Sequence, residues 1–583
     1  MLRPWELREC NLPSLEWGQS CQLHSDVRNY GGRVCLIKKL RRLSVLLLLP
    51  IAACTAAAQA DGSSASAPAR SQVWVADQGD GTYRNPIINA DYSDPDVIRV
   101  GDDFYLVASS FNCAPGLPVL HSHDLVNWTI IGHALQRQPP EEIFSKPQHG
   151  NGVWAPAIRY HNGEFFIFYP DPDRGIYLTK SKNAAGPWSE PLLIKPARGW
   201  IDPCPLWDAD GKAYLVSAMA ASRSGIKSIL IVSRMSPDGT KLLDEGVIVF
   251  DGHDANPTVE GPKFYQRNGY YYIFAPAGGV EQGWQLVLRA KNVYGPYESR
   301  KVLAQGKTQV NGPHQGAWVD TRSGESWFIH FQDKAASGRV IHLQPMKWEG
   351  DWPVIGDDPD GDGVGEPVSV YRKPNVGRSW PISTPADSDE FNQNQLGLQW
   401  QWQANPGSNW MFPAGSLGFI RLFNVPLPPG YKNFWEVPNL LLQKFPAPEW
   451  TVTTKLTFTP RADNERTGLI IMGLDYAYIG LKRTGNGLYI SQSICKDADR
   501  GSEERETEPT LVSGQTFYLR VVVSNGTCRF SYSLDGLKFT TIGVPFVARQ
   551  GRWIGAKVGI FAVGGAQARE TGYADFDWFR VSK

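Results

Sequence analysis

Five strand-and-turn units recur between residues 83 and 375, and this recurrence constrains the fold more than any other feature. In each unit an apolar run rich in aromatic residues follows a short turn that contains glycine, at intervals of about 50 to 60 residues. The turns are Gly101-Asp102, Asn162-Gly163, Asp210-Gly211, Asn268-Gly269 and Ser323-Gly324. Asn-Gly and Asp-Gly turns favour β-hairpins, and a period of this length built from hairpins is typical of a β-propeller. Residues 83–375 are therefore predicted to form five blades.

A second all-β region follows a segment rich in Pro, Gly and Asp. We expect residues 61–82 and 376–387 to be linkers and residues 388–583 to form a β-sandwich, because alternating strands recur there. Its clearest predicted strands are 451–458, 467–474, 476–482, 516–523 and 559–563. Trp410 and Phe412 either reach the neighbouring domain or pack at the surface. The predicted fold class is all-β, a five-bladed β-propeller followed by a β-sandwich.

The first 60 residues have the features of an export signal. Residues 38–42 are mostly basic, and the largely apolar stretch 43–53 is too short to span a bilayer. Two cleavage sites compete: the residues before Cys54 resemble a bacterial lipobox, which would make Cys54 a lipid anchor, and Ala58-Gln59-Ala60 is a plain signal-peptidase site. We expect an exported bacterial protein that is periplasmic, extracellular or an outer-membrane lipoprotein.

Charge and cysteine content exclude two classes of function. The chain carries 58 Lys and Arg against 58 Asp and Glu, so it has no basic footprint for nucleic acid. The cysteines that follow the signal lack the Cys-x-x-Cys spacing of a zinc site. Aromatic residues make up 12% of the chain, which suits both a β-sheet core and stacking on sugars.

Three carboxylates stand beside proline or glycine at the edges of predicted strands. They are Asp94 in Ser93-Asp94-Pro95-Asp96, Asp202 in Ile201-Asp202-Pro203, and Glu260 in Val259-Glu260-Gly261-Pro262. Cleavage of a glycosidic bond needs one acid and one base, and a neighbouring carboxylate helps to keep the acid protonated. The inner strands of propeller blades converge on a central channel, so these three distant residues are expected to meet there.

These segments, in this order and spacing, resemble glycoside hydrolase family 43. Asn85-Pro86 leading to Asp94 is similar to the family's opening segment, and Glu260 with Gly269-Tyr270-Tyr271-Tyr272 is similar to its general-acid segment. The chain looks most like the members that join a five-bladed propeller to a concanavalin-A-like β-sandwich. The resemblance implies that Asp94 is the general base, Glu260 the general acid, and Asp202 the residue that orients the acid and modulates its pKa.

The resemblance also implies an inverting reaction, in which base and acid stand about 6.5–9.5 Å apart with a water between base and sugar. Asp96 competes with Asp94 for the role of base, because strand alternation puts both on one face. We favour Asp94, which precedes a proline as in the family.

Further site residues follow from the resemblance and from aromatic composition. Gly338-Arg339-Val340 resembles the segment whose arginine binds sugar hydroxyls, with a surface ion pair as the alternative. Trp154 and Phe111 are candidate walls of the sugar subsite.

No cofactor is expected for the chemistry, but structural Ca²⁺ is considered at three places. His314 resembles a central histidine that binds calcium in some members of the family, and a satisfied core histidine is the alternative. Glu390 and Asp575 are candidates for a shared calcium in the sandwich. The acidic run 358–363 lacks the bidentate Glu of an EF-hand and is favoured as a solvated turn.

The expected function is an inverting exo-glycosidase that releases terminal β-D-xylosyl residues from xylan-derived oligosaccharides of plant cell walls. An α-L-arabinofuranosidase acting on arabinoxylan or arabinan is the alternative, because the two sugars differ little in ring and linkage geometry. An endo-acting arabinanase would need an open cleft. A glycan-binding, lectin-like protein is the non-enzymatic alternative, against which the three carboxylates argue.

Overall fold

The computed structural model describes residues 70–564 and 571–583, all of which belong to one compact unit, Ser66–Lys583. The predicted export signal and Cys54 lie outside these described residues. Within them, no helix has the length and apolar character needed to cross a bilayer.

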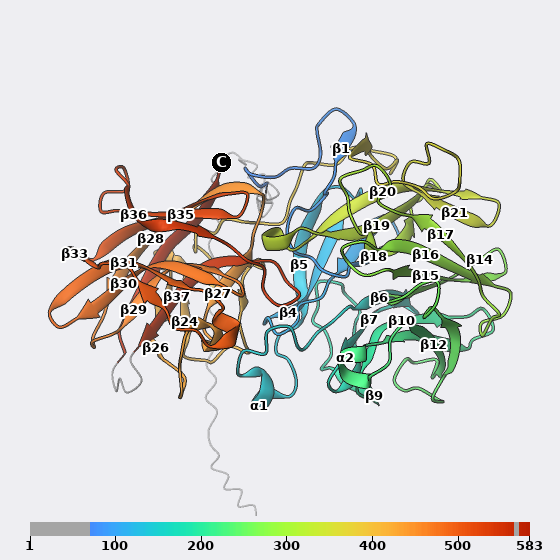
Figure 1. Cartoon of the computed structure of the whole chain (residues 1–583), viewed down its shortest axis with the longest axis horizontal. Helices are drawn as coiled ribbons and strands as arrows, with labels where there is room; N and C mark the ends of the chain where they lie inside the picture. The colour runs from blue at the N-terminus through green and yellow to red at the C-terminus, as the bar shows by residue number, and fades with distance from the viewer. Residues whose placement is uncertain (1–69, 565–570) are drawn as a thin grey trace, which may run out of the picture. The chain divides into compact units, whose positions relative to one another are not determined.

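Five antiparallel four-stranded sheets confirm the predicted propeller (Figure 1, blue to yellow). Each sheet consists of four consecutive strands in chain order. The first two are β2 (Asp96–Val100), β3 (Asp103–Val107), β4 (Gly116–Ser122) and β5 (Trp128–Leu135), then β6 (Ala157–His161), β7 (Glu164–Asp171), β8 (Gly175–Ser181) and β9 (Leu192–Pro196). The third is β10 (Trp200–Trp207), β11 (Ala213–Met219), β12 (Ile229–Met235) and β13 (Val247–Asp251). The last two are β14 (Lys263–Arg267), β15 (Tyr270–Ala277), β16 (Trp284–Ala290) and β17 (Glu298–Leu303), then β18 (His314–Asp320), β19 (Ser326–Asp333), β20 (Arg339–Glu349) and β21 (Trp352–Ile355).

The predicted hairpins are the first two strands of each blade. Every glycine-containing turn joins an inner strand to the aromatic-rich second strand, for example β2 to β3 and β14 to β15. The inner strand β2 contacts both β6 and β18, and β10 contacts both β6 and β14, so the inner strands surround one channel. The only α-helices among the described residues are the four-residue α1 (Glu141–Phe144) and α2 (Ala221–Ser224).

The ring is closed by hydrogen bonds between the segment that enters the first blade and strand β20 of the last blade. The Asn85 side chain donates to the Leu343 carbonyl and accepts from the Leu343 amide, both at 2.8 Å. Ile88 and Ile341 exchange backbone hydrogen bonds, and the Tyr92 amide donates to the Arg339 carbonyl. Residues at the two ends of the propeller sequence therefore lie side by side.

Two larger sheets form the predicted sandwich (Figure 1, orange and red). The nine-stranded sheet comprises β23 (Gln401–Trp402), β26 (Val425–Pro426), β27 (Leu441–Lys444), β29 (Arg466–Met472), β30 (Tyr476–Thr484), β31 (Gly487–Cys495), β32 (Arg505–Glu506), β33 (Thr510–Val512) and β37 (Lys557–Gly564). The seven-stranded sheet comprises β24 (Met411–Ala414), β25 (Phe419–Phe423), β28 (Glu449–Thr459), β34 (Thr516–Ser524), β35 (Thr527–Ser533), β36 (Thr540–Val547) and β38 (Tyr573–Ser582). Their facing apolar side chains, such as Val452, Ile479 and Phe576, belong to one buried core.

The segments before and after the propeller are packed against the rest of the chain, as far as they are described. The Ser71 amide donates to Thr384 Oγ1 at 2.7 Å, and Val73 is part of the sandwich core. Strand β1 (Thr82–Arg84) pairs with β22 (Val370–Arg372), so the two linking segments are joined to each other.

The propeller and the sandwich contact each other through backbone and amide hydrogen bonds. Ala114 and Trp402 exchange backbone hydrogen bonds of 3.1 and 2.6 Å, and the Asn405 side chain bridges the backbone amide and carbonyl of Gln138. These contacts hold the propeller segment that begins at Phe111 against the sandwich.

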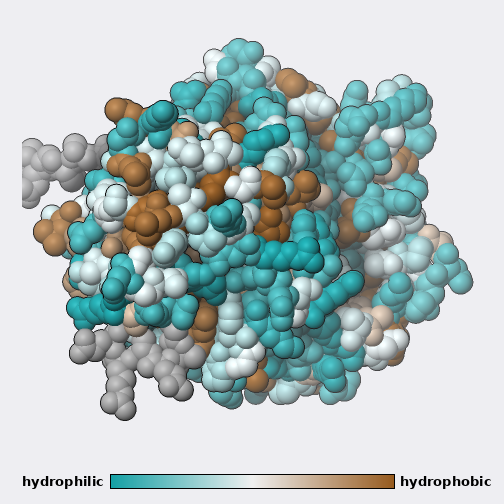
Figure 2. All heavy atoms as spheres, turned by 60° about the vertical axis from the view of Figure 1, so that its left-hand side comes forward, coloured by the Kyte–Doolittle hydropathy of each residue, from teal (hydrophilic) through white to brown (hydrophobic). Residues whose placement is uncertain are grey.

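Neither of the aromatic residues singled out in the sandwich lines the pocket described below. Trp410 is buried in the sandwich core beside Trp402, and Phe412 is exposed. On the face shown in Figure 2, hydrophobic side chains form separate small patches among hydrophilic ones.

Candidate active site

Asp94 lies in the segment that closes the propeller ring, two residues before β2. It is 5% exposed, and its backbone adopts a left-handed conformation with φ of 57° immediately before Pro95. Asp94 Oδ1 accepts from Arg339 Nη1 at 3.0 Å, and Oδ2 accepts from the hydroxyls of Ser93 and Ser109, each at 2.6 Å. Such charge-assisted bonds hold a carboxylate in one orientation.

Asp96, the competing candidate, has a different environment. It is fully buried, and its Oδ2 accepts from the Ile158 amide at 2.8 Å and from Arg159 Nη1 at 2.6 Å. Arg159 also donates to Cys204 Sγ, so Asp96 ties the inner strands of the first three blades together. Asp94 lines the pocket described below and Asp96 does not.

Asp202 and Glu260 form a second pair of carboxylates on neighbouring blades. Asp202 is 4% exposed and occupies an irregularity in β10, with φ of 55° before Pro203. Its Oδ2 accepts from the Gly261 amide at 2.7 Å. Burial, together with the nearby charge of Glu260, raises the pKa of Asp202 to about 7.

Gly261 is required by this arrangement. Its φ is +59°, and a β-carbon at this position would lie 2.7 Å from the Gln315 side chain. Glycine at position 261 therefore allows the amide that directly follows Glu260 to donate to Asp202.

Glu260 also contacts His314, from the first position of β18. His314 Nε2 lies 3.1 Å from Glu260 Oε1, and the imidazole is 1% exposed. The other ring nitrogen, Nδ1, is buried and has no hydrogen-bond partner among the described residues. His314 is thus a direct neighbour of the predicted acid.

The pocket over these groups is a cavity of about 130 Å³. Six of the residues expected in the site line it, together with a tryptophan from the sandwich. The lining consists of Asp94, Phe111, Trp154, Ala155, Ile201, Asp202, Glu260, Val280, Gln315, Arg339 and Trp553. The structure thus brings the three carboxylates of separate blades around one small space.

Arg339 lies inside the pocket, so the alternative of a surface ion pair is wrong. Its side chain is 9% exposed and pairs with Asp94, and its backbone amide donates to Asp91 Oδ1 at 2.8 Å. Nε of Arg339 has no hydrogen-bond partner among the described residues, which leaves a buried donor beside the pocket.

Trp553 and Ser109 are site residues that the sequence did not point to. Trp553 comes from the loop before β37, is half-exposed, and lies edge-on to Trp154 with ring centroids 6.4 Å apart. Nothing in the local sequence distinguishes Trp553 from a surface tryptophan. Ser109 follows β3 and reaches Asp94 only because the fold brings the two segments together.

The contacts of Glu390 and Asp575 argue against the shared calcium predicted for them. Both oxygens of Glu390 accept from Arg580 at 2.7 and 2.8 Å, and both oxygens of Asp575 accept from Arg421 at the same distances. A carboxylate held by a bidentate arginine has few lone pairs left for a cation.

The acidic run 358–363 forms a turn that uses its own carboxylates. Asp358 accepts from the amides of Gly361 and Gly363, and Asp362 accepts from the Val364 amide. These bonds form a turn, in which one ligand oxygen each of Asp358, Asp360 and Asp362 also lies within 4.8 Å of the others.

Three carboxylates that converge on one pocket from separate blades include the acid and base groups that hydrolysis of a glycosidic bond requires. Comparison with known families agrees: the sequence model of glycosyl hydrolases family 43 matches residues 83–353, and that of the β-xylosidase C-terminal concanavalin-A-like domain matches residues 388–582. The chain belongs to glycosyl hydrolases family 43.

Relatives match along both domains. A predicted β-xylosidase of Xylanibacter ruminicola is 42% identical over 83% of this chain and 86% of its own length. A β-xylosidase of Formosa agariphila is 31% identical over 92% of this chain and 97% of its own. A non-reducing-end α-L-arabinofuranosidase of Bacteroides ovatus is 29% identical over 85% and 94%.

Solved structures share the fold. A family 43 protein of Bacillus licheniformis superposes with a TM-score of 0.75 at 27% identity, covering 86% of this chain and 99% of its own. A xylan β-1,4-xylosidase of Bacillus halodurans superposes with a TM-score of 0.76 at 25% identity, covering 86% and 100%.

The environments of Asp94 and Asp96 predict different outcomes for the two asparagine variants. D94N is expected to fold and to lose turnover by about 10²–10⁴-fold, the usual contribution of a general base. D96N is expected to lower the melting temperature, because it weakens a buried ion pair whose loss costs up to about 3–5 kcal/mol. Thermal unfolding and glycosidase assays on both variants, with exposed D210N as control, separate the roles. Full turnover in D94N would show that Asp94 is not the base.

Proposed function

We propose that this protein is an inverting exo-glycosidase that releases terminal β-D-xylosyl residues from xylan-derived oligosaccharides. The observation that carries the proposal is the convergence of Asp94, Asp202 and Glu260 on one small pocket. The β-xylosidase names of relatives that align along both domains support xylose as the sugar.

In this mechanism Asp94 removes a proton from a water as that water attacks the anomeric carbon. Glu260 gives its proton to the departing glycosidic oxygen at the same time. Burial and the nearby charge of Glu260 raise the pKa of Asp202 to about 7, so Asp202 holds a proton beside Glu260 up to about neutral pH. Asp202 therefore keeps a proton available to Glu260, and its bond from the Gly261 amide orients the pair.

Arg339 and the aromatic walls position the sugar. Arg339 lies against Asp94 and lines the pocket, so its guanidinium is placed to bind a sugar hydroxyl. Phe111 and Trp154 line the pocket, where their faces suit the C–H groups of a pyranose ring.

The small size of the pocket supports exo action. Its volume of about 130 Å³ is far below the roughly 300–1,000 Å³ of pockets for drug-sized ligands, which fits one terminal sugar. Trp553 closes part of it from the sandwich domain. An endo-acting arabinanase would need a cleft open at both ends.

An α-L-arabinofuranosidase is the second candidate, and the Bacteroides ovatus relative with that name supports it. The substrate under either proposal is a plant cell-wall oligosaccharide or polysaccharide. A lectin-like function is disfavoured, because sugar binding alone does not need three carboxylates around one pocket.

We propose that the chemistry needs no cofactor, because the pocket provides both acid and base. Structural calcium at His314 would rest on a single nitrogen, Nδ1, whereas calcium prefers six to eight oxygen ligands. No set of three His, Cys, Asp or Glu ligands among the described residues includes His314. Water would have to supply most of such a shell, and no step of the mechanism depends on it.

We propose export across the cytoplasmic membrane, supported by the basic and apolar residues 38–53. Cys54 would carry a lipid anchor if the lipobox-like site is used, and cleavage after Ala60 would release an unanchored protein. The mass of the mature N-terminal peptide distinguishes these two products.

The first prediction under this proposal concerns substrate and acid. The purified protein should release nitrophenol from p-nitrophenyl β-xyloside faster than from p-nitrophenyl α-L-arabinofuranoside. E260Q should lose about 10²–10⁴-fold on xylobiose but less on the nitrophenyl substrate, whose leaving group needs little protonation. E298Q, which changes an exposed glutamate, is the control. No release from either glycoside by folded protein would overturn the enzymatic proposal.

The second prediction concerns pH. With the pKa of Asp202 at about 7, kcat/KM should fall as pH rises through about 7, because Asp202 then loses the proton that it holds beside Glu260. D202N should lower kcat and alter this alkaline limb, because the group that titrates near pH 7 is gone. The surface variant D244N should leave the profile unchanged. An alkaline limb that D202N does not move would contradict the coupling.

The same shift has a consequence for stability. The folded pKa of Asp202 is raised, so between about pH 4 and pH 7 the native state holds a proton that the unfolded chain has lost. The contribution of Asp202 to stability therefore declines as pH rises through this window, and D202N should lack that decline.

The third prediction concerns Trp553. W553A should raise KM for xylobiose, because the pocket loses a wall that the sandwich contributes. Wild-type protein acting on xylohexaose should initially release xylose alone. F412A removes an exposed aromatic side chain of the same domain and is the matched control. An unchanged KM in W553A, measured by xylose release, would exclude Trp553 from the sugar subsite.

A further inference from the structure

Two histidines and an aspartate converge at one end of β3 and β4, the two middle strands of the first blade, and none of them lines the catalytic pocket. Asp103 begins β3, His121 is near the end of β4, and His123 follows β4. His121 and His123 alternate along the chain and so lie on one face. The register pairs Phe104 with Ser122, which puts Asp103 opposite His123.

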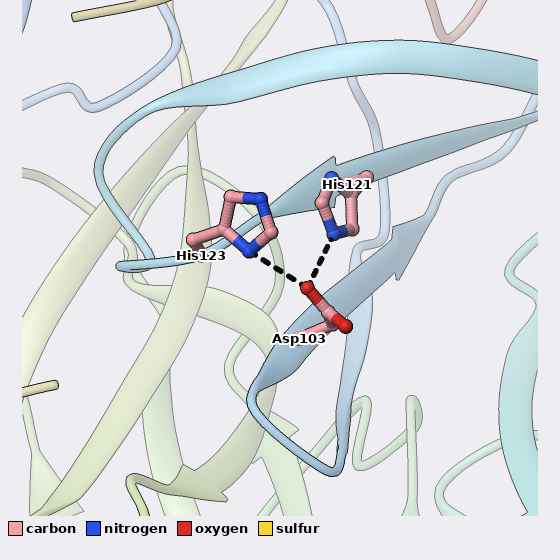
Figure 3. Close-up of side chains that lie close together, drawn as sticks. All are labelled: Asp103, His121 and His123. Carbon is pink, nitrogen blue, oxygen red and sulfur yellow. Dashed lines mark hydrogen bonds and ion pairs between the residues drawn. The ribbon is translucent and has the colours of Figure 1, made fainter. Parts of the chain in front are cut away.

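The three side chains point nitrogen and oxygen atoms at one small space (Figure 3). His121 Nε2 lies 2.9 Å from Asp103 Oδ1, and His123 Nδ1 lies 2.7 Å from the same oxygen. The ligand atoms all lie within 4.8 Å of one another. His123 Nδ1 is buried but lacks the geometry of a hydrogen bond, so the ion-pair contact with Asp103 does not satisfy it.

We propose that Asp103, His121 and His123 form a binding site for a divalent transition metal of the Zn²⁺ class. Two imidazoles and one carboxylate are ligands that zinc, cobalt, nickel and copper prefer, whereas calcium and magnesium prefer all-oxygen sites. Ligands in a tetrahedral zinc site stand about 3.3 Å apart, given zinc–ligand bonds of about 2.0–2.1 Å. A small outward rotation of these side chains provides that spacing.

The surroundings fix the ligands and leave room for water. The His123 ring stacks on Trp380 at 3.8 Å with an interplanar angle of 12°, and Tyr105 packs beside His121. Side-chain exposures of 21% for His121, 37% for His123 and 36% for Asp103 leave an open position for solvent. A bound ion would tie the β3–β4 hairpin to Trp380, in the segment that leads to the sandwich, and so stabilise the fold.

The positive charge of Arg378 would repel a bound cation. Its guanidinium lies 3.8 Å from the centroid of the Trp380 ring, close to the proposed site. Because Asp103 supplies only one negative charge and Arg378 adds a positive one, the affinity for a metal ion is limited. The preference of the site for one metal over another is therefore expected to come from its two imidazoles and one carboxylate, and not from net charge.

Titration of the full chain, purified without a histidine tag, with ZnCl₂ tests the proposal. Calorimetry should give one site per chain, the melting temperature should rise saturably with Zn²⁺ but not with Mg²⁺ or Ca²⁺, and Co²⁺ should give visible absorption of a tetrahedral site. H121A, H123A and D103N should each weaken binding by at least about 10–100-fold, the loss usual for outer-shell partners alone.

The matched control is H253A. His253 pairs with Asp251 at 2.6 Å on the surface without a second histidine, so its removal should leave Zn²⁺ affinity unchanged. If an alanine variant fails to fold, D103N, which keeps the side-chain shape, carries the same test. Absence of the saturable site in wild-type protein, or equal affinity in H121A and wild type, would overturn the proposal. Hydrolysis of the nitrophenyl glycosides should be unaffected by all three site variants.

Discussion

The ion pair between Arg339 and Asp94 joins the closure of the propeller to the geometry of the catalytic pocket. Arg339 begins strand β20 of the last blade, and Asp94 lies in the segment that leads into the first blade, 245 positions earlier. Both side chains are buried, and removal of one partner of such a pair leaves an uncompensated charge at a cost of several kcal/mol. The backbone bonds between Tyr92 and Arg339 act at the same seam. Closure of the ring therefore supplies the charged partner that helps to hold the proposed base in place.

The sandwich contributes to the same pocket from the other side. Phe111 begins a propeller segment that hydrogen-bonds to the sandwich through Ala114 and Trp402, and Trp553 comes from the sandwich itself. One wall of the pocket is therefore held by the interface between the domains, and another belongs to the second domain. This division explains why a chain of this kind carries a β-sandwich that provides none of the three carboxylates.

Local sequence revealed the features that depend on turns and on neighbouring residues. The glycine-containing turns predicted the five hairpins, and proline or glycine beside Asp94, Asp202 and Glu260 marked the carboxylates. Contacts between distant strands were not visible. Arg421 stands directly opposite Asp575 in the register of β25 and β38, which no local pattern reveals, so the calcium prediction for Asp575 conflicts with its contacts. The environment of Asp96 likewise depends on Arg159, which a neighbouring blade supplies.

The same backbone conformation occurs at or directly after all three carboxylates, at the positions that proline and glycine marked in the sequence. Asp94, Asp202 and Gly261 have φ of 57°, 55° and 59°, and each directly precedes a proline. This left-handed conformation is uncommon for residues other than glycine and costs about 1–3 kcal/mol where it is strained.

The surrounding contacts offset that cost. The side chain of Asp94 receives hydrogen bonds from Arg339, Ser93 and Ser109, and that of Asp202 receives one from the Gly261 amide. In regular strand geometry these side chains would alternate between the two faces of a blade. The left-handed residue interrupts that alternation where the inner strand begins or bulges, so that the carboxylates of the first, third and fourth blades line one pocket. A following proline favours extended backbone at the residue before it, so the left-handed break is held by the surrounding contacts and not by the proline. The same interruption in three blades converts a repeated structural unit into a single site.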